Sequence, residues 1–160
     1  MKKNLFILFS IVFFTGCPLD YYYSIRCYNV SDIDPICCVL DKCLSDSSVT
    51  AGSQYACLTK DYIYAFDFNR RPEKEIKDSI AIYFLNPEAA DIDLYYGIIS
   101  KTAAKTINNS PNLILATYIF SVKQLKALDW SYSFPPDEKM KELGVLTIPS
   151  YEELNEKYRK

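Results

Sequence analysis

Short apolar runs separated by turn-forming residues constrain this chain more than any other feature. The clearest are Ile36–Leu40, Ser79–Leu85 and Leu113–Phe120, which are rich in β-branched and aromatic residues. Runs of this length, bounded by Pro, Asp, Asn or Ser, are typical of β-strands. The other candidate strands are Ser24–Val30, Tyr55–Leu58, Asp61–Phe68 and Ser131–Phe134. Only a turn at 31–35 separates the two most N-terminal strands, so these are predicted to form a hairpin-like pair.

Helix signals lie mainly in the second half of the chain. Asn-Pro-Glu at 86–88 is typical of a helix start and predicts a helix over 87–100. Residues 121–124 match a capping box and predict a short helix that ends near Trp130. A second box at 150–153 predicts a short exposed helix at the C-terminus.

The N-terminal segment has the pattern of an export signal. Two lysines at 2–3 precede an apolar run, Leu5–Phe14, in which only Ser10 is polar. A membrane-spanning helix needs roughly 20 apolar residues, so this run fits the apolar region of a signal peptide better. The sequence Phe-Thr-Gly-Cys that ends at Cys17 resembles the bacterial lipobox, which implies lipidation of that cysteine and cleavage just before it. A plain secretory signal cut near residue 16 and an uncleaved anchor are the alternatives.

These patterns together predict the fold class and the organisation of the chain. Mostly strands, with helices inserted late, indicate a mainly β fold. We expect an antiparallel sandwich-like arrangement or an α+β sheet, with two or three short helices in the C-terminal half. The predicted organisation is a signal peptide (1–16), a lipidated Cys with a short tether (17–23), one globular domain (24–148) and a helical tail (149–160). A length of 160 residues is suited to one such domain.

Composition excludes several classes of function. The chain has no His, which excludes a Ser-His-Asp triad, a Cys-His dyad and a His metal ligand. Its formal charge of −2 lacks the basic footprint that nucleic-acid binding needs. The acidic pairs Asp32/Asp34 and Asp91/Asp93 are interpreted as carboxylates of turns and helix starts, and no Gly-rich phosphate loop is present. We therefore predict a protein that is not an enzyme, with no cofactor or metal besides the diacylglycerol and acyl chains on Cys17.

Five cysteines remain in the fold if Cys17 is lipidated. They are Cys27, Cys37, Cys38, Cys43 and Cys57. Export beyond the inner membrane permits disulfides, and Cys43 with Cys57 is the candidate pair because it would close one polar loop. An odd number leaves at least one thiol unpaired. Buried free thiols and a four-cysteine zinc site are the alternatives.

Aromatic residues are the remaining lead to a binding site. The candidates are Tyr62, Tyr64, Phe66, Phe68, Trp130 and Tyr132. Tyr and Trp provide rigid contact area for a protein partner or a sugar. The four residues at 62–68 alternate with others along one strand, so they share a sheet face. Packing in the core is the competing interpretation for this face and for Trp130.

The chain also resembles a known group of bacterial proteins. The resemblance rests on the lipobox, on YNVSD at 28–32, on the strand that leads into Asn-Pro at 86–87, and above all on the C-terminal third. There a strand ends in Tyr-Ile-Phe at 118–120 and is followed by a Leu pair at 125 and 128. A Trp at 130, a Phe-Pro-Pro step at 134–136 and Lys-Met at 139–140 come next. These features are similar to small uncharacterised lipoproteins of Bacteroidetes, especially gut Bacteroidales. The resemblance implies envelope localisation and no particular chemistry.

The sequence therefore predicts a lipid-anchored envelope protein, at the outer membrane, that is not an enzyme. We expect it to bind a partner protein or a glycan through an aromatic sheet face. A structural component that docks to an envelope complex and a carboxylate-based hydrolase are the alternatives. The membrane, reached through the lipid, is the one partner that follows directly from the lipobox.

Overall fold

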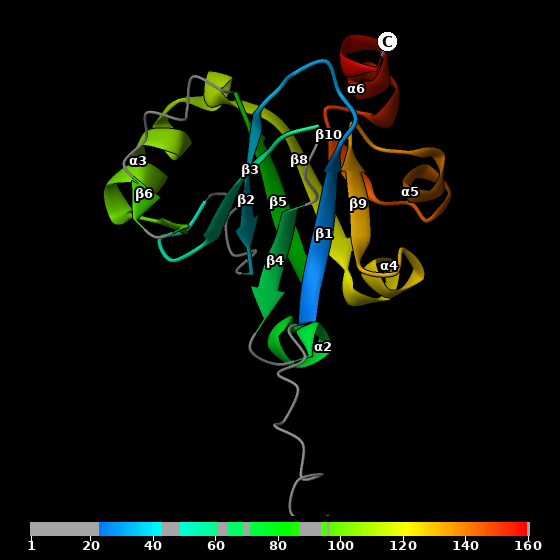
Figure 1. The fold of residues 1–160 in the computed structure, drawn as a ribbon, viewed down its shortest axis with the longest axis horizontal. Coiled ribbons are helices and arrows are strands. Elements are labelled where there is room, and N and C mark those ends of the chain that lie inside the picture. Colours follow the sequence, from blue (N-terminus) through cyan, green and yellow to red (C-terminus); the bar gives the residue numbers. More distant parts are fainter. Residues whose placement is uncertain are drawn as a thin grey trace, which may run out of the picture.

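Two β-sheets and several short helices make up the protein (Figure 1). The computed structural model describes residues 23–42, 49–60, 64–68, 71–86, 94–95 and 97–159. Within these residues one sheet has seven strands and the other has three. The predicted mainly β, sandwich-like class is confirmed. The signal peptide and all but the last residue of the tether, 17–23, lie outside the described residues.

The elements follow the chain in a β-rich first half and a more helical second half. The first half holds β1 (Tyr23–Asn29), β2 (Ile36–Asp41), β3 (Gln54–Leu58), β4 (Tyr64–Phe68), α2 (Pro72–Glu75) and β5 (Ser79–Leu85). The second half holds β6 (Leu94–Tyr95), β7 (Ile98–Ile99), α3 (Lys101–Asn109), the 3-10 helix η2 (Pro111–Leu113), β8 (Ile114–Ser121), α4 (Val122–Ala127), β9 (Ser131–Phe134), α5 (Glu138–Glu142), β10 (Leu146–Ile148) and α6 (Tyr151–Tyr158).

Most strands lie next to strands that are distant in the sequence; the exceptions are the pairs β2-β3 and β6-β7. The larger sheet runs β10-β8-β5-β2-β3-β7-β6, and the smaller runs β4-β1-β9. Neighbours are antiparallel throughout, except that β1 and β9 are parallel. Because β1 and β2 lie in different sheets, the predicted hairpin-like pair is wrong. The turn between them is held by its own side chains instead: the Asn29 amide donates to the Ile33 carbonyl at 2.7 Å, and the Ser31 hydroxyl lies 2.7 Å from the Asn29 carbonyl oxygen.

The larger sheet is covered on both faces. One face packs against the smaller sheet, and aromatic rings of Phe84, Tyr118 and Phe134 fill the space between them. The other face packs against α3, with Val39 and Ile107 in a second buried cluster. All six residues of β2 are buried, which explains why its first five residues form a continuous apolar run rather than an alternation.

The described part of the second half contains four short α-helices, where two or three were predicted. The predicted helix over 87–100 is not formed at its end, since 94–95 and 98–99 are strands; residues 87–93 and 96 lie outside the described residues. Gly97 connects β6 to β7 with a φ of +72°, which Gly adopts without strain. The helix begins later, at α3, where the Ser100 hydroxyl accepts a hydrogen bond from the Ala103 amide at 3.0 Å.

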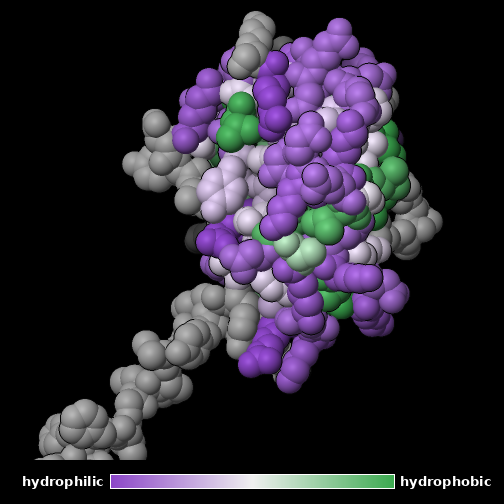
Figure 2. Space-filling view, turned by 90° about the vertical axis from the view of Figure 1, so that its right-hand side faces the viewer, coloured by the Kyte–Doolittle hydropathy of each residue, from purple (hydrophilic) through white to green (hydrophobic). Residues whose placement is uncertain are grey.

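Both predicted capping boxes are present, at the starts of α4 and α6. Helix α6 is not exposed as predicted, because Leu154 and Tyr158 are buried in the main core. The side of the molecule that carries α4, α5 and α6 is mostly hydrophilic, with small apolar patches (Figure 2). These helices therefore bury one face and present polar residues outward. Within the described residues, no helix is long and apolar enough to cross a membrane.

Candidate functional site

Three of the four predicted aromatic side chains that the structure describes lie in the core. Phe66, Phe68 and Tyr132 are only 1%, 2% and 2% exposed, so these three do not form an open binding face. Strands β4 and β9 flank β1 in the smaller sheet, and the rings point inward against the larger sheet. Tyr62 and the side chain of Tyr64 lie outside the described residues.

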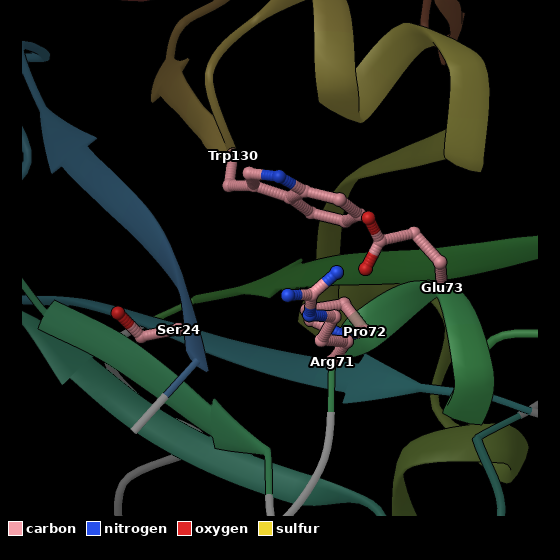
Figure 3. A pocket seen from close by; sticks show the side chains of 5 residues that line it. All are labelled: Ser24, Arg71, Pro72, Glu73 and Trp130. Carbon is pink, nitrogen blue, oxygen red and sulfur yellow. The ribbon is translucent and has the colours of Figure 1, made fainter. Parts of the chain in front are cut away.

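Among the predicted aromatics whose side chains the structure describes, Trp130 is the one that is only half-buried and lines a hollow. Its half-buried ring lines a hollow of about 230 Å³ together with Ser24, Arg71, Pro72 and Glu73. In Figure 3 the ring lies along one side, Arg71 and Glu73 extend toward it from the start of α2, and Ser24 lies across from them on β1. The hollow thus joins segments that are far apart in the sequence.

The backbone at Trp130 adopts a conformation that side chains normally avoid. Helix α4 ends in a Schellman motif, in which the Trp130 amide donates to the Leu125 carbonyl at 2.8 Å and the Asp129 amide to the Lys126 carbonyl at 3.1 Å. Asp129 and Trp130 have φ values of +52° and +54°. Left-handed conformations of residues other than Gly cost roughly 1–2 kcal/mol each. Such strain is concentrated at functional positions, which directs attention to this turn.

Strand β1 holds this turn in place. The Arg26 amide donates to the Trp130 carbonyl at 2.8 Å. The Arg26 guanidinium donates to the Asp129 carbonyl at 3.0 Å and to its carboxylate at 3.1 Å. The Ser131 hydroxyl donates to the Leu128 carbonyl at 2.7 Å. The backbone from which the Trp130 ring projects is therefore held in place by these hydrogen bonds.

The hollow carries charges of both signs. A hydrogen bond with its own backbone lowers the pKa of Glu73, and the Lys126 ammonium, 3.2 Å away, lowers it further. Glu73 is therefore ionised at neutral pH, beside the Arg71 guanidinium. An aromatic ring, an anion, a cation and the Ser24 hydroxyl are suited to binding a ligand that has both apolar and hydroxyl-rich surface.

The cysteines that the structure describes, Cys27, Cys37, Cys38 and Cys57, all have free thiols. Cys17 and Cys43 lie outside the described residues, so lipidation and the Cys43–Cys57 disulfide stay predictions. Cys57 has a free thiol, and its sulfur lies 2.8 Å from the sulfur of Cys37. The Tyr55 hydroxyl lies 2.8 Å from the Cys37 sulfur and 3.0 Å from the Cys57 sulfur.

Sequence reasoning missed Arg71 and Glu73, because they lie in a charged connector with no motif. The sequence could have identified Tyr55 as a neighbour of Cys57, because two residues that are two positions apart in a strand lie on the same face of the sheet. Of the acidic pairs, Asp32 and Asp34 lie in the turn after β1, as predicted, while Asp91 and Asp93 lie outside the described residues.

Within the part of the chain that the structure describes, no three Cys, Asp or Glu side chains are grouped so that they could hold a metal ion. Comparisons of the chain with family models, with curated proteins and with solved structures give no match.

Proposed function

We propose that this protein is a lipid-anchored outer-membrane protein that is not an enzyme and that binds a saccharide at the Trp130 hollow. The observation that carries the proposal is the placement of Trp130. Two consecutive residues in the left-handed region, fastened to β1, hold a half-buried indole at the rim of a hollow. One part of the ring packs against the main core, and the rest lines the hollow, where a ligand can reach it.

The size and charge of the hollow favour a saccharide unit. Its volume of about 230 Å³ is below the roughly 300–1,000 Å³ of sites for larger ligands, so it would take a single ring. The Lys126 ammonium, 3.2 Å from Glu73, offsets that carboxylate, and Arg71 adds hydrogen-bond donors, which favours a ligand rich in hydroxyl groups. The indole would stack on the apolar face of the sugar while the charged groups accept and donate hydrogen bonds.

The predicted anchor would keep this site near the bilayer. Ser24, which lines the hollow, follows Cys17 by seven residues, and a chain of that length spans at most about 25 Å. With lipid on Cys17, the ligand would be a saccharide close to the membrane surface. The resemblance to small lipoproteins of Bacteroidetes supports the anchor.

A second candidate function is docking to another envelope protein. Strand β10 is an edge of the larger sheet, and its Leu146 and Ile148 are 54% and 57% exposed. Exposed edges of this kind can pair with a strand of a partner. The saccharide proposal predicts that changes at β10 leave ligand binding unaffected.

The binding test uses the fact that Trp130 is the only tryptophan of the chain. The full chain in detergent micelles is titrated with oligosaccharides from peptidoglycan and from the lipopolysaccharide core, with indole fluorescence as the signal and calorimetry as the check. We expect saturable binding, which Arg71→Ala weakens by about tenfold because a charged hydrogen bond is lost.

Matched variants separate binding from loss of signal. By calorimetry, Trp130→Ala should abolish binding and Trp130→Phe should retain part of it. Lys105→Ala, which removes an exposed charge on α3, should leave it unchanged. Binding that is equal in Trp130→Ala and the parent protein, or absent for every saccharide, would overturn the saccharide proposal.

The anchor is tested separately by labelling cells with a palmitate analogue. The parent protein should take up the label and fractionate with the outer membrane, and Cys17→Ala should take up none. Cys27→Ser is the control, because it removes a different cysteine. Equal labelling of Cys17→Ala would exclude the lipobox assignment.

A further inference from the structure

The pair Cys37 and Cys57 lies on the opposite side of β2 from the main core, away from the residues of the Trp130 hollow. The two residues are direct partners in the antiparallel ladder between β2 and β3. Cross-strand partners of this kind have Cα atoms close enough for a disulfide.

The hydrogen bonds of β3 show which type of pair this is. On the far side from β2, the Tyr55 amide donates to the Gly97 carbonyl at 2.8 Å, and the Ser53 carbonyl accepts from the Ile99 amide at 2.9 Å. The backbone groups of alternate residues point the same way, so those of Cys57 also point away from β2. Cys37 and Cys57 therefore occupy a pair without mutual backbone hydrogen bonds, in which side chains approach most closely.

The two sulfur atoms are already in contact, at 2.8 Å, with the Tyr55 hydroxyl bridging them at 2.8 and 3.0 Å. Their exposure differs sharply, because Cys57 is exposed and Cys37 is completely buried. An external reagent can therefore reach one sulfur only. The second sulfur can be reached only by the first, as in a pair of attacking and resolving cysteines.

Hydrogen bonding favours the same division of roles. The Cys37 thiol, by donating to the Cys57 sulfur, lowers the pKa of Cys57 to about 6, and the Tyr55 hydroxyl lowers it further against the opposing effect of burial. The same hydrogen bond is the main cause of a raised pKa at Cys37, and burial adds to it. At neutral pH the exposed sulfur is thus the thiolate, which is the nucleophile in disulfide exchange.

We infer that Cys57 and Cys37 form a cross-strand disulfide by exchange with an external disulfide. The Cys57 thiolate attacks one sulfur of the external disulfide, forming a mixed disulfide and releasing one thiolate. The Cys37 sulfur then attacks the Cys57 sulfur and breaks the mixed disulfide, and the proton of Cys37 passes to the second thiolate as it leaves. Overall the protein dithiol is oxidised, and one external disulfide is reduced to two thiols.

Cys38, on the core-facing side of β2, and Cys27, on β1, do not take part in this exchange because no external reagent can reach them. Both are completely buried between the two sheets, and burial is the main cause of the raised pKa of Cys38. Cys38 is the natural control, because it neighbours Cys37 in sequence and points to the opposite face of β2.

The test exposes the reduced full chain in detergent to glutathione disulfide, quenches with acid and alkylates the remaining thiols. Cleavage before Asp residues separates the three relevant segments, since Asp34, Asp41 and Asp46 divide Cys37 and Cys38 from Cys43 and from Cys57. We expect the peptides 34–40 and 46–60 to be joined, with fragmentation placing the link on Cys37 rather than Cys38. A link from Cys57 to Cys43, or a Cys57 that stays alkylatable, would overturn the inference.

Two variants test the order of the steps. Cys37→Ser should stop at the mixed disulfide, so glutathione accumulates on Cys57, whereas Cys38→Ser should still form the internal link. In the parent protein the rate of the first step should fall as pH is lowered through about 6, because the Cys57 thiolate becomes protonated. Glutathione that remains on Cys57 of the parent protein would show that Cys37 does not resolve it.

Discussion

The two faces of β2 carry the same residue type in adjacent positions and give it opposite properties. Cys38 points into the core between the sheets, where Phe84 is its partner on β5. Cys37 points toward the α3 side, where it contacts the exposed Cys57 and the Tyr55 hydroxyl. An external reagent can therefore reach a cysteine on one face only, through the exposed Cys57. The difference lies in the neighbours and not in the residue, since both sulfurs are completely buried.

The largest expected effect is on the core face. Phe84→Ala should lower the free energy of unfolding by about 3–5 kcal/mol, because the ring packs between Tyr118 and Phe134 at centroid distances of 4.7 and 4.5 Å. Urea denaturation of the reduced full chain measures this. Leu146→Ala, at an exposed edge position, is the control and should change it by less than about 0.5 kcal/mol. Equal effects of the two variants would contradict the packing of this face.

The second effect belongs to the α3 face and depends on redox state. Oxidised protein should be more stable than reduced protein by about 3 kcal/mol, since a link between residues 20 apart in sequence restricts the unfolded chain. The urea midpoints of the protein with and without a reductant measure this stability difference. In Cys57→Ser the two midpoints should be equal. A difference that persists in Cys57→Ser would assign it to other cysteines.

Much of this arrangement follows from sequence patterns. Continuous apolar runs located β2, β5 and β8, and capping boxes located α4 and α6, because these signals depend on neighbours along the chain. The pairing of β1 with β4 and β9 was not predictable, since strand partners are chosen by packing between distant segments. For the same reason the sequence could not show that Phe66 and Tyr132 point inward, or that Arg71 meets Trp130.

The neighbours of Cys57 show the same limit in one strand pair. Closing one polar loop made Cys43 the candidate partner of Cys57, and Cys43 lies outside the described residues; the sequence did not show that the register between β2 and β3 places Cys37 opposite Cys57. Register is set by burial of the whole strand rather than by any one pair. Adjacent residues of a strand face opposite sides of the sheet, and this alternation is what distinguishes Cys37 from Cys38.

Serine substitutions compare the two faces directly under reducing conditions. Cys38→Ser should lower the free energy of unfolding by about 1–3 kcal/mol, because it puts a hydroxyl into an aromatic core. Cys37→Ser should cost under about 1 kcal/mol, since its hydroxyl can keep the hydrogen bond with Tyr55. Urea denaturation shows which of the two variants loses more stability. A larger loss for Cys37→Ser would contradict the interpretation that the α3 face of β2 tolerates a polar group better than the core face.

The smallest expected changes in the free energy of unfolding, for Tyr55→Phe and Tyr118→Phe, should have opposite signs. Tyr55→Phe removes a hydroxyl that contacts two sulfurs, so it should destabilise the reduced protein by about 1 kcal/mol and raise the pKa of Cys57. Among the described residues the buried Tyr118 hydroxyl has no hydrogen-bond partner, so Tyr118→Phe should stabilise the protein by about the same amount. Urea denaturation gives both stabilities, and the pH dependence of Cys57 alkylation gives the pKa. A change of stability in the same direction for both variants would show that the two faces do not differ in their effect on polar groups. Opposite signs would show that the Tyr55 hydroxyl stabilises the fold on the α3 face, whereas the unpaired Tyr118 hydroxyl destabilises it on the core face.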